Sequence, residues 1–252
     1  MDDFLKIRRR PEFRQEIISN NLEIVKLAIA SSVSKDTFII QAISTIDDLD
    51  KLCNLLTRRV REWYGYYFPE LSVHIEDDEI YIRQILLKSK EEFMQEFNLK
   101  VSMGPKLEEK DLEAIIGLVR SVEQLYSERE SIIHYLKELM QEHCRNLYTV
   151  VGALIGAKLL QKAGSLKHLS QMPSSTIQVL GAESALFRHL RNKKIRPPKH
   201  GIILSHPLVM NARRDMRGKR SRQLAAKISI AAKVDYFKGE FIGDKLKEEL
   251  EK

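Results

Sequence analysis

Apolar side chains recur every three or four residues along much of the chain, and this spacing predicts long helices. The first such pattern lasts four heptads within residues 36–68 and runs through Ile39, Ala42, Ile46, Leu49, Cys53, Leu56, Val60, Trp63 and Tyr67. Pro69 follows it, and proline both lacks an N–H donor and disfavours helical geometry in the preceding residue. The pattern therefore predicts one helix that packs through a continuous seam and stops before Pro69.

A second seam follows further along the chain and runs through Leu112, Ile115, Val119, Val122, Tyr126, Ile133, Leu136 and Met140. Arg129 interrupts it where the register expects an apolar residue, and acidic residues at 108, 109 and 111 favour a helix start by complementing the helix dipole. A connector of about forty residues separates the two seams, too long for a tight turn, but the helices can still pack antiparallel. We expect residues 36–146 to form a coiled-coil dimerisation domain with a tip built from 72–104.

The remaining segments have shorter patterns. Residues 1–35 are predicted to be an N-terminal helical segment, with Phe13, Ile17, Leu22, Val25 and Ile29 available for packing. Residues 147–241 have short apolar runs broken by Gly and Pro, which predicts a compact bundle whose last helix runs from about 219 to 236. Residues 242–252 are expected to be a charged tail. Ile202 to Leu204 is the one weak strand pattern, so the predicted fold class is all-α.

Composition restricts the function classes. The 252 residues are 43% hydrophobic and 31% charged, which is typical of a globular chain. Cys53 and Cys144 are too few for a disulfide framework or a cysteine zinc cluster, so a reducing compartment is expected. No stretch approaches the roughly 18 apolar residues of a membrane-spanning helix, and no signal peptide is recognisable. We expect a soluble intracellular protein that does not enter a membrane.

Positive charge is concentrated in one part of the sequence. The chain carries a formal net charge of +7, but residues 158–222 contain 15 Lys and Arg against two acids, whereas the rest is net negative. Such a local excess attracts polyanions and is more than solubility requires. Nucleic acid is the obvious partner class. An acidic protein or an anionic membrane surface would use the same charge.

Enzyme signatures fail when they are tested. Residues 152–158 superficially suggest a phosphate loop, but they lack its spacing and favour a helix-packing GxxxG pattern. Asp47, Asp48 and Asp50 could suggest a metal cluster, yet their place between seam positions favours a solvated helix face. His143 and Cys144 lack a third catalytic group and are interpreted as packing residues. We therefore expect no catalytic residues, metal or cofactor.

The basic region contains a candidate recognition helix. Gly181 can provide a tight entry to a helix beginning near Ala182, whose backbone amides could face a phosphate. Leu186 and Leu190 are expected to be core residues. For the basic run 188–196, phosphate contact and a merely solvated face are nearly balanced on local evidence, and the second cluster at 213–222 favours nucleic acid.

Several phrases in this region resemble the Nop-domain family in order and spacing, namely GAKLLQKAGSLKHLSQMPSSTIQVLGAESALFRHL, PPKHGIILSHPLV and GKRSRQLAAKISIAAKVDYF. The helix ending in REWYGYYFPEL is similar to the coiled coil that precedes this domain in the family. The resemblance covers about residues 36–241 and is nearest to the archaeal scaffold proteins of box C/D small ribonucleoproteins. It implies an assembly scaffold for guide-directed RNA 2'-O-methylation and no enzymatic activity of its own.

The resemblance also implies partners: a box C/D guide RNA, the ribosomal-protein-like protein that binds its kink-turn, a fibrillarin-type methyltransferase, and a second copy of the chain bound through the coiled coil. The methyltransferase normally docks on an N-terminal domain that is not recognisable in residues 1–35, which puts that partner in doubt. The archaeal resemblance implies a cytoplasmic location, and a eukaryotic protein would be nucleolar.

The RNA and kink-turn protein are expected to contact Gly181, Ala182, Glu183, Ser184, Arg188, His189, Arg191, Lys194, Arg196, Lys199, His206, Arg213, Arg214, Arg217, Lys219, Arg220 and Arg222. Position 184 is Ser where the family commonly has Lys, which removes one expected phosphate contact. The predicted dimerisation residues are Trp63, Tyr64, Tyr66, Tyr67 and Phe68, because one antiparallel helix pair cannot cover so much aromatic surface.

Two other functions stay open. An RNA-processing enzyme would use the basic face as a substrate groove, but it would need a positioned acid, base, nucleophile or metal. A coiled-coil interaction protein whose basic half binds acidic partners would show no dependence on RNA.

Overall fold

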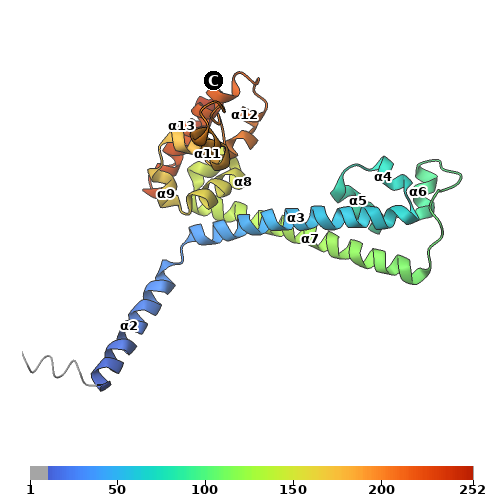
Figure 1. Ribbon diagram of the computed structural model, residues 1–252, viewed down its shortest axis with the longest axis horizontal. Helices are drawn as coiled ribbons and strands as arrows, with labels where there is room; N and C mark the ends of the chain where they lie inside the picture. Colours follow the sequence, from blue (N-terminus) through green and yellow to red (C-terminus); the bar gives the residue numbers. More distant parts are fainter. Residues whose placement is uncertain (1–10, 252) are drawn as a thin grey trace, which may run out of the picture.

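The computed structural model describes the chain from residue 11 to residue 251, and this part contains helices and no strand. A long two-helix arm carries small helices at one end and a compact helical domain at the other (Figure 1). The arm and its tip comprise α3 (Lys35–Tyr67), α4 (Glu70–His74), α5 (Asp78–Leu87), α6 (Lys90–Glu96) and α7 (Glu109–His143). The expected all-α class is confirmed.

The compact domain is built from α8 (Arg145–Ala163), α9 (Leu166–Gln171), α10 (Ser174–Val179), α11 (Glu183–Arg191), α12 (Pro207–Met210), α13 (Arg217–Tyr236) and α14 (Gly243–Glu251), with a 3-10 helix η1 (Ile202–Ser205). The weak strand pattern at 202–204 therefore does not correspond to a strand, because these residues lie in η1. A further helix, α2 (Pro11–Ser32), projects away from the base of the arm (Figure 1). The calls on residues 1–10 lie outside the described part of the chain.

Helices α3 and α7 pack antiparallel, as the two seams predict. At the base of the arm, Asp36 Oδ1 of α3 lies 2.7 Å from His143 Nε2 of α7. Near the tip, the hydroxyls of Thr57 and Tyr126 are 3.3 Å apart. Between them, Arg129 forms an ion pair with Asp50, which explains why an arginine interrupts the second seam.

The seam of α3 shifts by one position towards the tip. The buried residues there are Thr57, Val60 and Tyr64, whereas the predicted Trp63 is 44% exposed. The shift follows from the tip, because α5 packs against α3 and places the Tyr81 ring 6.4 Å from that of Tyr64 in an edge-on contact. Predicted members Leu56 and Tyr67 are only half-buried.

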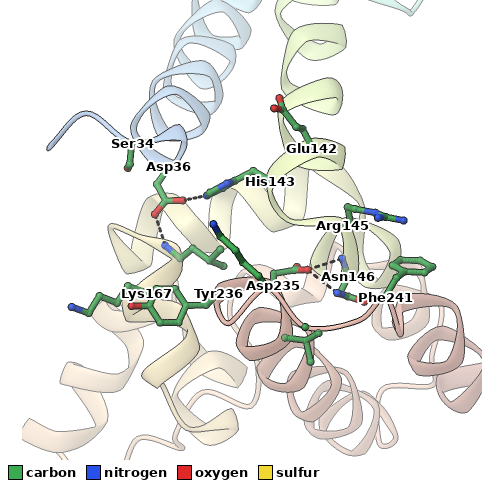
Figure 2. Close-up of a pocket in the computed structure, with 14 residues that line it drawn as sticks. Ser34, Asp36, Glu142, His143, Arg145, Asn146, Lys167, Asp235, Tyr236 and Phe241 are labelled. Atoms are coloured by element: carbon green, nitrogen blue, oxygen red, sulfur yellow. Dashed lines mark hydrogen bonds and ion pairs between the residues drawn. The ribbon is translucent and has the colours of Figure 1, made fainter. Parts of the chain in front are cut away.

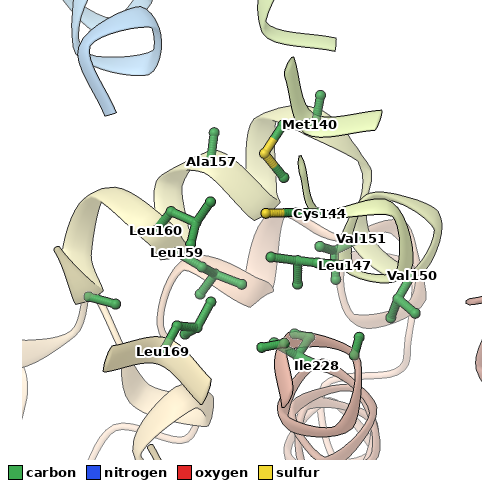
Figure 3. Close-up of a cluster of buried hydrophobic side chains, with 14 of the residues drawn as sticks. Met140, Cys144, Leu147, Val150, Val151, Ala157, Leu159, Leu160, Leu169 and Ile228 are labelled. Atoms are coloured by element: carbon green, nitrogen blue, oxygen red, sulfur yellow. The ribbon is translucent and has the colours of Figure 1, made fainter. Parts of the chain in front are cut away.

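The compact domain and the base of the arm share one hydrophobic core. Met140 and Cys144 at the end of α7 contact the cluster that contains Leu147, Leu160 and Ile228 (Figure 3). Apolar residues of α3 from 39 to 46 belong to the same cluster. The expected domain boundary between 146 and 147 falls inside α8, whose first turns belong to the core shared with the arm.

Helix α8 is kinked at Gly152, where φ is +78°. This backbone region is unfavourable for residues with a Cβ, which explains the glycine. Gly156 has a different role, because a Cβ there would lie 2.6 Å from the Met140 Cε. The GxxxG interpretation therefore holds for Gly156, at the contact with α7, and was wrong for Gly152.

The C-terminal residues are part of the fold. The expected charged tail forms α14, which packs on α8 and buries Leu246 and Leu250 in the shared core. The Asn146 side chain accepts a 2.7 Å hydrogen bond from the backbone N–H of Ile242, which fixes the entry to this helix. Apolar residues four apart on one face explain the packing, and the charged residues occupy the other face.

Candidate nucleic-acid interface

The predicted recognition helix α11 lies in a loop that leaves the domain and returns at the same place. We call residues 181–201 the α11 loop. Its ends are joined by backbone hydrogen bonds from Gly201 N to Gln178 O (2.9 Å) and from Ile202 N to Leu180 O (2.8 Å). The Gln178 side chain adds a 2.7 Å bond to the carbonyl of Lys199. The loop is therefore anchored at its base, although its helix has no buried residue.

Glycine is required at both ends of the α11 loop. Gly181 has φ +89°, and a Cβ there would lie 2.5 Å from Ile202 Cγ1. A Cβ on Gly201 would lie 1.9 Å from the carbonyl oxygen of Leu180, which no rearrangement of a side chain could relieve. The tight entry expected at Gly181 is confirmed, and the matching requirement at Gly201 was missed.

Helix α11 has no buried residue, which contradicts the expected core role of Leu190. Leu190 is 52% exposed and Phe187 is 58% exposed, while Leu186 is half-buried. The reason is that no side chain of the α11 loop belongs to the hydrophobic core of the domain. Its apolar side chains are therefore available to a partner.

The amides at the start of α11 are partly occupied. The Glu183 carboxylate accepts a 2.7 Å hydrogen bond from the backbone N–H of Gly181. Partial burial raises the pKa of Glu183, but hydrogen bonds from its own backbone and from Gly181 outweigh that effect and lower it overall. A phosphate at this helix terminus would have to use the backbone N–H of exposed Ser184, because those of Ala182, Ala185 and Leu186 donate to backbone carbonyls.

The two basic clusters meet at the start of α13. A Cβ on Gly218 would lie 3.6 Å from Lys199 Cδ, so the end of the α11 loop lies against the N-terminal turn of α13. Nine predicted cations are exposed and form no ion pair with a described carboxylate: Arg188, Arg191, Lys194, Arg196, Lys199, Arg213, Arg214, Lys219 and Arg222. Fold geometry thus brings Lys199 beside the N-terminal turn of α13, 19 residues further along the sequence.

Other predicted residues have structural partners. Arg217 donates to the carbonyls of Met210 and Ala212, both at 3.1 Å, and so holds the turn before α13. His189 is bonded to the carbonyl of Ile195 inside the α11 loop. Arg220 is half-exposed and donates to Gln223. These residues shape the interface, and their predicted contacts with RNA stay predictions.

His206 lies at the kink of α8. Its Nδ1 accepts a 3.2 Å hydrogen bond from the backbone N–H of Leu208, and its ring also bonds to the backbone of Val150. Desolvation lowers the pKa of His206, and the nearby positive charge of Lys247 lowers it further. The structure thus gives His206 a role inside the fold that the sequence did not indicate.

The predicted dimerisation residues divide into two groups. Tyr64 and Phe68 are buried inside the tip, so their assignment to a dimer surface was wrong. Tyr67 is half-buried beneath the Lys90 ammonium, which lies 4.5 Å from its ring centre. Trp63 and Tyr66 remain exposed on the outer face of α3 and line a shallow hollow together.

A polar joint at the base of the arm was also missed. Asp36 contacts His143 and accepts a 2.9 Å hydrogen bond from the backbone N–H of Leu166 (Figure 2). Burial raises the pKa of Asp36, but the hydrogen bonds from His143 and Leu166 lower it overall. His143 is therefore more than a packing residue. Asp36 and His143 are 107 positions apart in the sequence, so their contact could not be predicted from local sequence patterns.

Asp235 forms the second half of the joint. Its carboxylate accepts hydrogen bonds from the backbone N–H groups of Asn146 (3.0 Å) and Leu147 (2.8 Å), at the start of α8 (Figure 2). A cavity of about 480 Å³ lies between these groups and Phe241. Because both Asp36 and Asp235 are satisfied by protein donors, the joint is suited to fixing helices and not to proton transfer.

No metal cluster forms in the described chain, where no three His, Cys, Asp or Glu side chains converge. The neighbouring acidic residues of α3 pair with different cations: Asp47 with Lys158 at 2.9 Å and Asp48 with Lys51 at 2.8 Å. None of the helices within residues 11–251 carries an apolar run of the length that a bilayer requires.

Comparison with known proteins gives consistent matches. A family model described as Nop, snoRNA binding domain, fibrillarin, matches residues 45–252. An uncharacterized NOP5 family protein of Methanocaldococcus jannaschii is 42% identical over 96% of this chain and 62% of the relative. Nucleolar protein 58 of Schizosaccharomyces pombe is 38% identical over 86% of this chain and 47% of the relative. The chain thus spans about half to three-fifths of these relatives.

A solved chain from a fibrillarin/Nop5p complex is similar in fold, with a TM-score of 0.56 over 97% of this chain and 79% of that chain, at 23% identity. The family match includes most of α3, the whole of α7 and the compact domain that carries the α11 loop. The family model matches residues 45–252, which include the anchored α11 loop and the basic clusters beside it. This match shows that the chain belongs to the Nop family.

Proposed function

We propose that this chain is a non-catalytic scaffold of box C/D small ribonucleoproteins, which binds a composite surface formed by a kink-turn RNA and its kink-turn-binding protein. One observation carries the proposal: the α11 loop presents exposed Phe187 and Leu190 beside exposed cations that no described carboxylate pairs. Apolar side chains suit a protein partner, whereas clustered Arg and Lys suit phosphates. A surface with both properties fits a preformed RNA and protein complex.

The proposal predicts how affinity depends on the partner. Phosphate contacts alone give weak binding that falls steeply as salt rises. A kink-turn protein adds the apolar contact to α11, and the α11 loop is already anchored at both ends, so little further ordering is needed. The two partners together should therefore bind far more tightly than RNA alone.

Two further partners belong to the same proposal. The exposed Trp63 and Tyr66 on α3 support self-association, because large aromatic side chains on an outer helix face are typical of interfaces. A fibrillarin-type methyltransferase is the proposed enzyme of the assembly. Two findings support it: the description of the matching family names fibrillarin, and the similar solved chain comes from a fibrillarin/Nop5p complex.

A gel-shift assay with a box C/D RNA tests the central claim. We expect weak retardation by the chain alone and a discrete ternary complex when the kink-turn protein is added. Equal affinity in both conditions would refute the composite surface. It would instead favour the coiled-coil interaction protein or a groove that binds RNA directly.

Arginine substitutions test the residues. Arg188→Ala and Arg220→Ala should each weaken the ternary complex by about 1–3 kcal/mol, the range for losing a charge-assisted hydrogen bond. Arg58, which is exposed on α3 and forms no ion pair with any described residue, provides the matched control, and Arg58→Ala should change RNA affinity little. If Arg58→Ala were as harmful as Arg188→Ala, binding would be diffuse electrostatics.

A further inference from the structure

A short basic turn joins α12 to α13. We call residues 211–216 the arginine turn, because it carries Arg213 and Arg214, two exposed cations that form no ion pair with any described residue. Asp215 is the one acid of the turn, and residues 213–222 carry six cations against it. The arginine turn is therefore positively charged as well as exposed.

The start of the arginine turn is fixed by the core of the domain. Val209 of α12 is fully buried in the shared hydrophobic core. Backbone hydrogen bonds continue from α12 into the turn, from Asn211 N to Pro207 O (3.0 Å) and from Ala212 N to Val209 O (3.3 Å). The chain therefore enters the turn in one defined direction.

Arg217, the first residue of α13, closes the arginine turn with its backbone and with its side chain. The N–H groups of Met216 and Arg217 both donate to the carbonyl of Arg213, at 2.8 and 3.0 Å. The guanidinium reaches back to the start of the turn, where Nε donates to Ala212 O and Nη2 donates to Met210 O, both at 3.1 Å. Because a guanidinium presents its donors in a rigid fork, this one side chain holds two carbonyls at a fixed separation.

Arg217 differs in its surroundings from the two arginines of the turn. It is half-buried, and buried Ser221 donates a 2.8 Å hydrogen bond from its Oγ to the Arg217 carbonyl. The side chains of Arg213 and Arg214 are exposed and form no hydrogen bond with a described group. The donors of Arg217 are thus partly used within the fold, whereas those of Arg213 and Arg214 are available to phosphates.

We propose that Arg217 is a positioning residue of the RNA interface. It holds the arginine turn so that Arg213 and Arg214 are presented to phosphates together, and it makes no phosphate contact of its own. A turn that is ordered before binding loses less conformational entropy on binding, and each presented arginine can hold a phosphate at two points. This inference rests on the proposed function, because it concerns the same RNA surface.

Limited digestion of the full chain with trypsin tests the hold on the turn without RNA. Cleavage after Arg213 or Arg214 requires the turn to open locally. We expect Arg217→Lys to raise the initial rate of cleavage at these two sites by about tenfold, because lysine lacks the fork that holds both carbonyls. Mass spectrometry identifies the fragments.

Arg220→Lys is the matched control for the digestion. Arg220 lies on the same helix, but its side chain donates to Gln223 and not to the turn, so its substitution should leave the cleavage rate unchanged. An unchanged rate in Arg217→Lys, or an equal rise in both variants, would overturn the proposal.

The salt dependence of RNA binding separates positioning from direct contact. Arg217→Lys keeps the positive charge, so a direct contact would still neutralise one phosphate and would leave the salt dependence as it is. If Arg217 positions the turn, the variant should bind the box C/D RNA and its kink-turn-binding protein about tenfold more weakly and with a shallower salt dependence, because contacts of Arg213 and Arg214 are lost. An unchanged salt dependence would overturn the proposal.

A double-mutant cycle tests whether Arg217 acts through the turn. In a chain that already carries Arg213→Ala and Arg214→Ala, Arg217→Lys should weaken the ternary complex by less than about twofold, whereas Arg220→Ala should keep its full effect. Independent, additive effects of Arg217→Lys would refute this inference alone. Failure of the original chain to form any ternary complex would instead refute the proposed function, and this inference with it.

Discussion

At position 181 the backbone conformation decides how the α11 loop leaves the domain. The positive φ and the short approach to Ile202 both exclude a Cβ. We expect Gly181→Ala to lower the free energy of unfolding by about 1–3 kcal/mol, the cost of forcing a side chain into this region, and to weaken the ternary RNA complex. Urea unfolding and the gel shift measure the two effects.

Gly65 provides the matched control for this prediction. It lies within α3, and no atom outside its own helical neighbourhood comes within 4 Å of a Cβ built there. Gly65→Ala should therefore stabilise the chain by about 0.5–1 kcal/mol through helix propensity. If both substitutions changed the free energy of unfolding in the same direction, the local conformation at Gly181 would not be the cause of the change.

The pKa of His206 predicts acid sensitivity. Because burial lowers its pKa below 6.5 in the folded chain, the unfolded chain binds the proton more readily. The stabilising contribution is complete above the unfolded pKa and is lost as pH falls through the folded pKa. Burial and the Lys247 ammonium disfavour the protonated ring, and together they outweigh the hydrogen bond to the Val150 backbone, which favours it. The Leu208 N–H faces Nδ1 as a donor, so a proton on Nδ1 would break that hydrogen bond.

We expect His206→Gln to reduce the loss of stability between about pH 7 and about pH 5, the interval in which an ordinary histidine becomes charged. Urea unfolding of both proteins at several pH values measures this slope. An identical slope in the variant would show that another group is responsible for the acid sensitivity.

At the scale of elements, α14 shows how a charged segment can be structural. Leu246 and Leu250 lie in the shared core, and Lys227 of α13 forms an ion pair with Glu249 of α14. We expect Leu250→Ala to lower the free energy of unfolding by about 2–4 kcal/mol, as for other buried leucines. Exposed Lys245→Ala should change it by less than about 0.5 kcal/mol. Similar small effects in both variants would show that α14 is a loosely attached tail.

At the scale of the whole molecule, we predict that the outer face of α3 mediates self-association. Trp63→Glu and Tyr66→Glu introduce charges on exposed aromatic positions without disturbing the buried Tyr64. We expect both variants to sediment as monomers where the original chain forms dimers, and to bind the kink-turn complex through the compact domain. Leu87→Glu, also exposed, should still dimerise. An original chain that is monomeric at micromolar concentration would refute this prediction.

The sequence by itself determined the two long helices of the arm, the end of α3 before Pro69 and the concentration of positive charge after residue 158. These features depend on neighbours three or four residues apart or on composition, so they can be recognised without knowing what packs where. The role of Gly181 can also be recognised from the sequence, because the neighbouring residues already indicate a tight helix entry.

Only the tertiary structure decided which faces were buried. Tyr64 is covered and Trp63 is not, because α5 lies on one side of α3. Leu190 lies outside the core although its spacing allows burial, because α11 contributes no side chain to the core cluster. Asp36 meets His143 across 107 positions of sequence. The burial of a side chain and its polar contacts depend on residues that are distant in sequence. Local periodicity carries no information about which of these residues will pack against it.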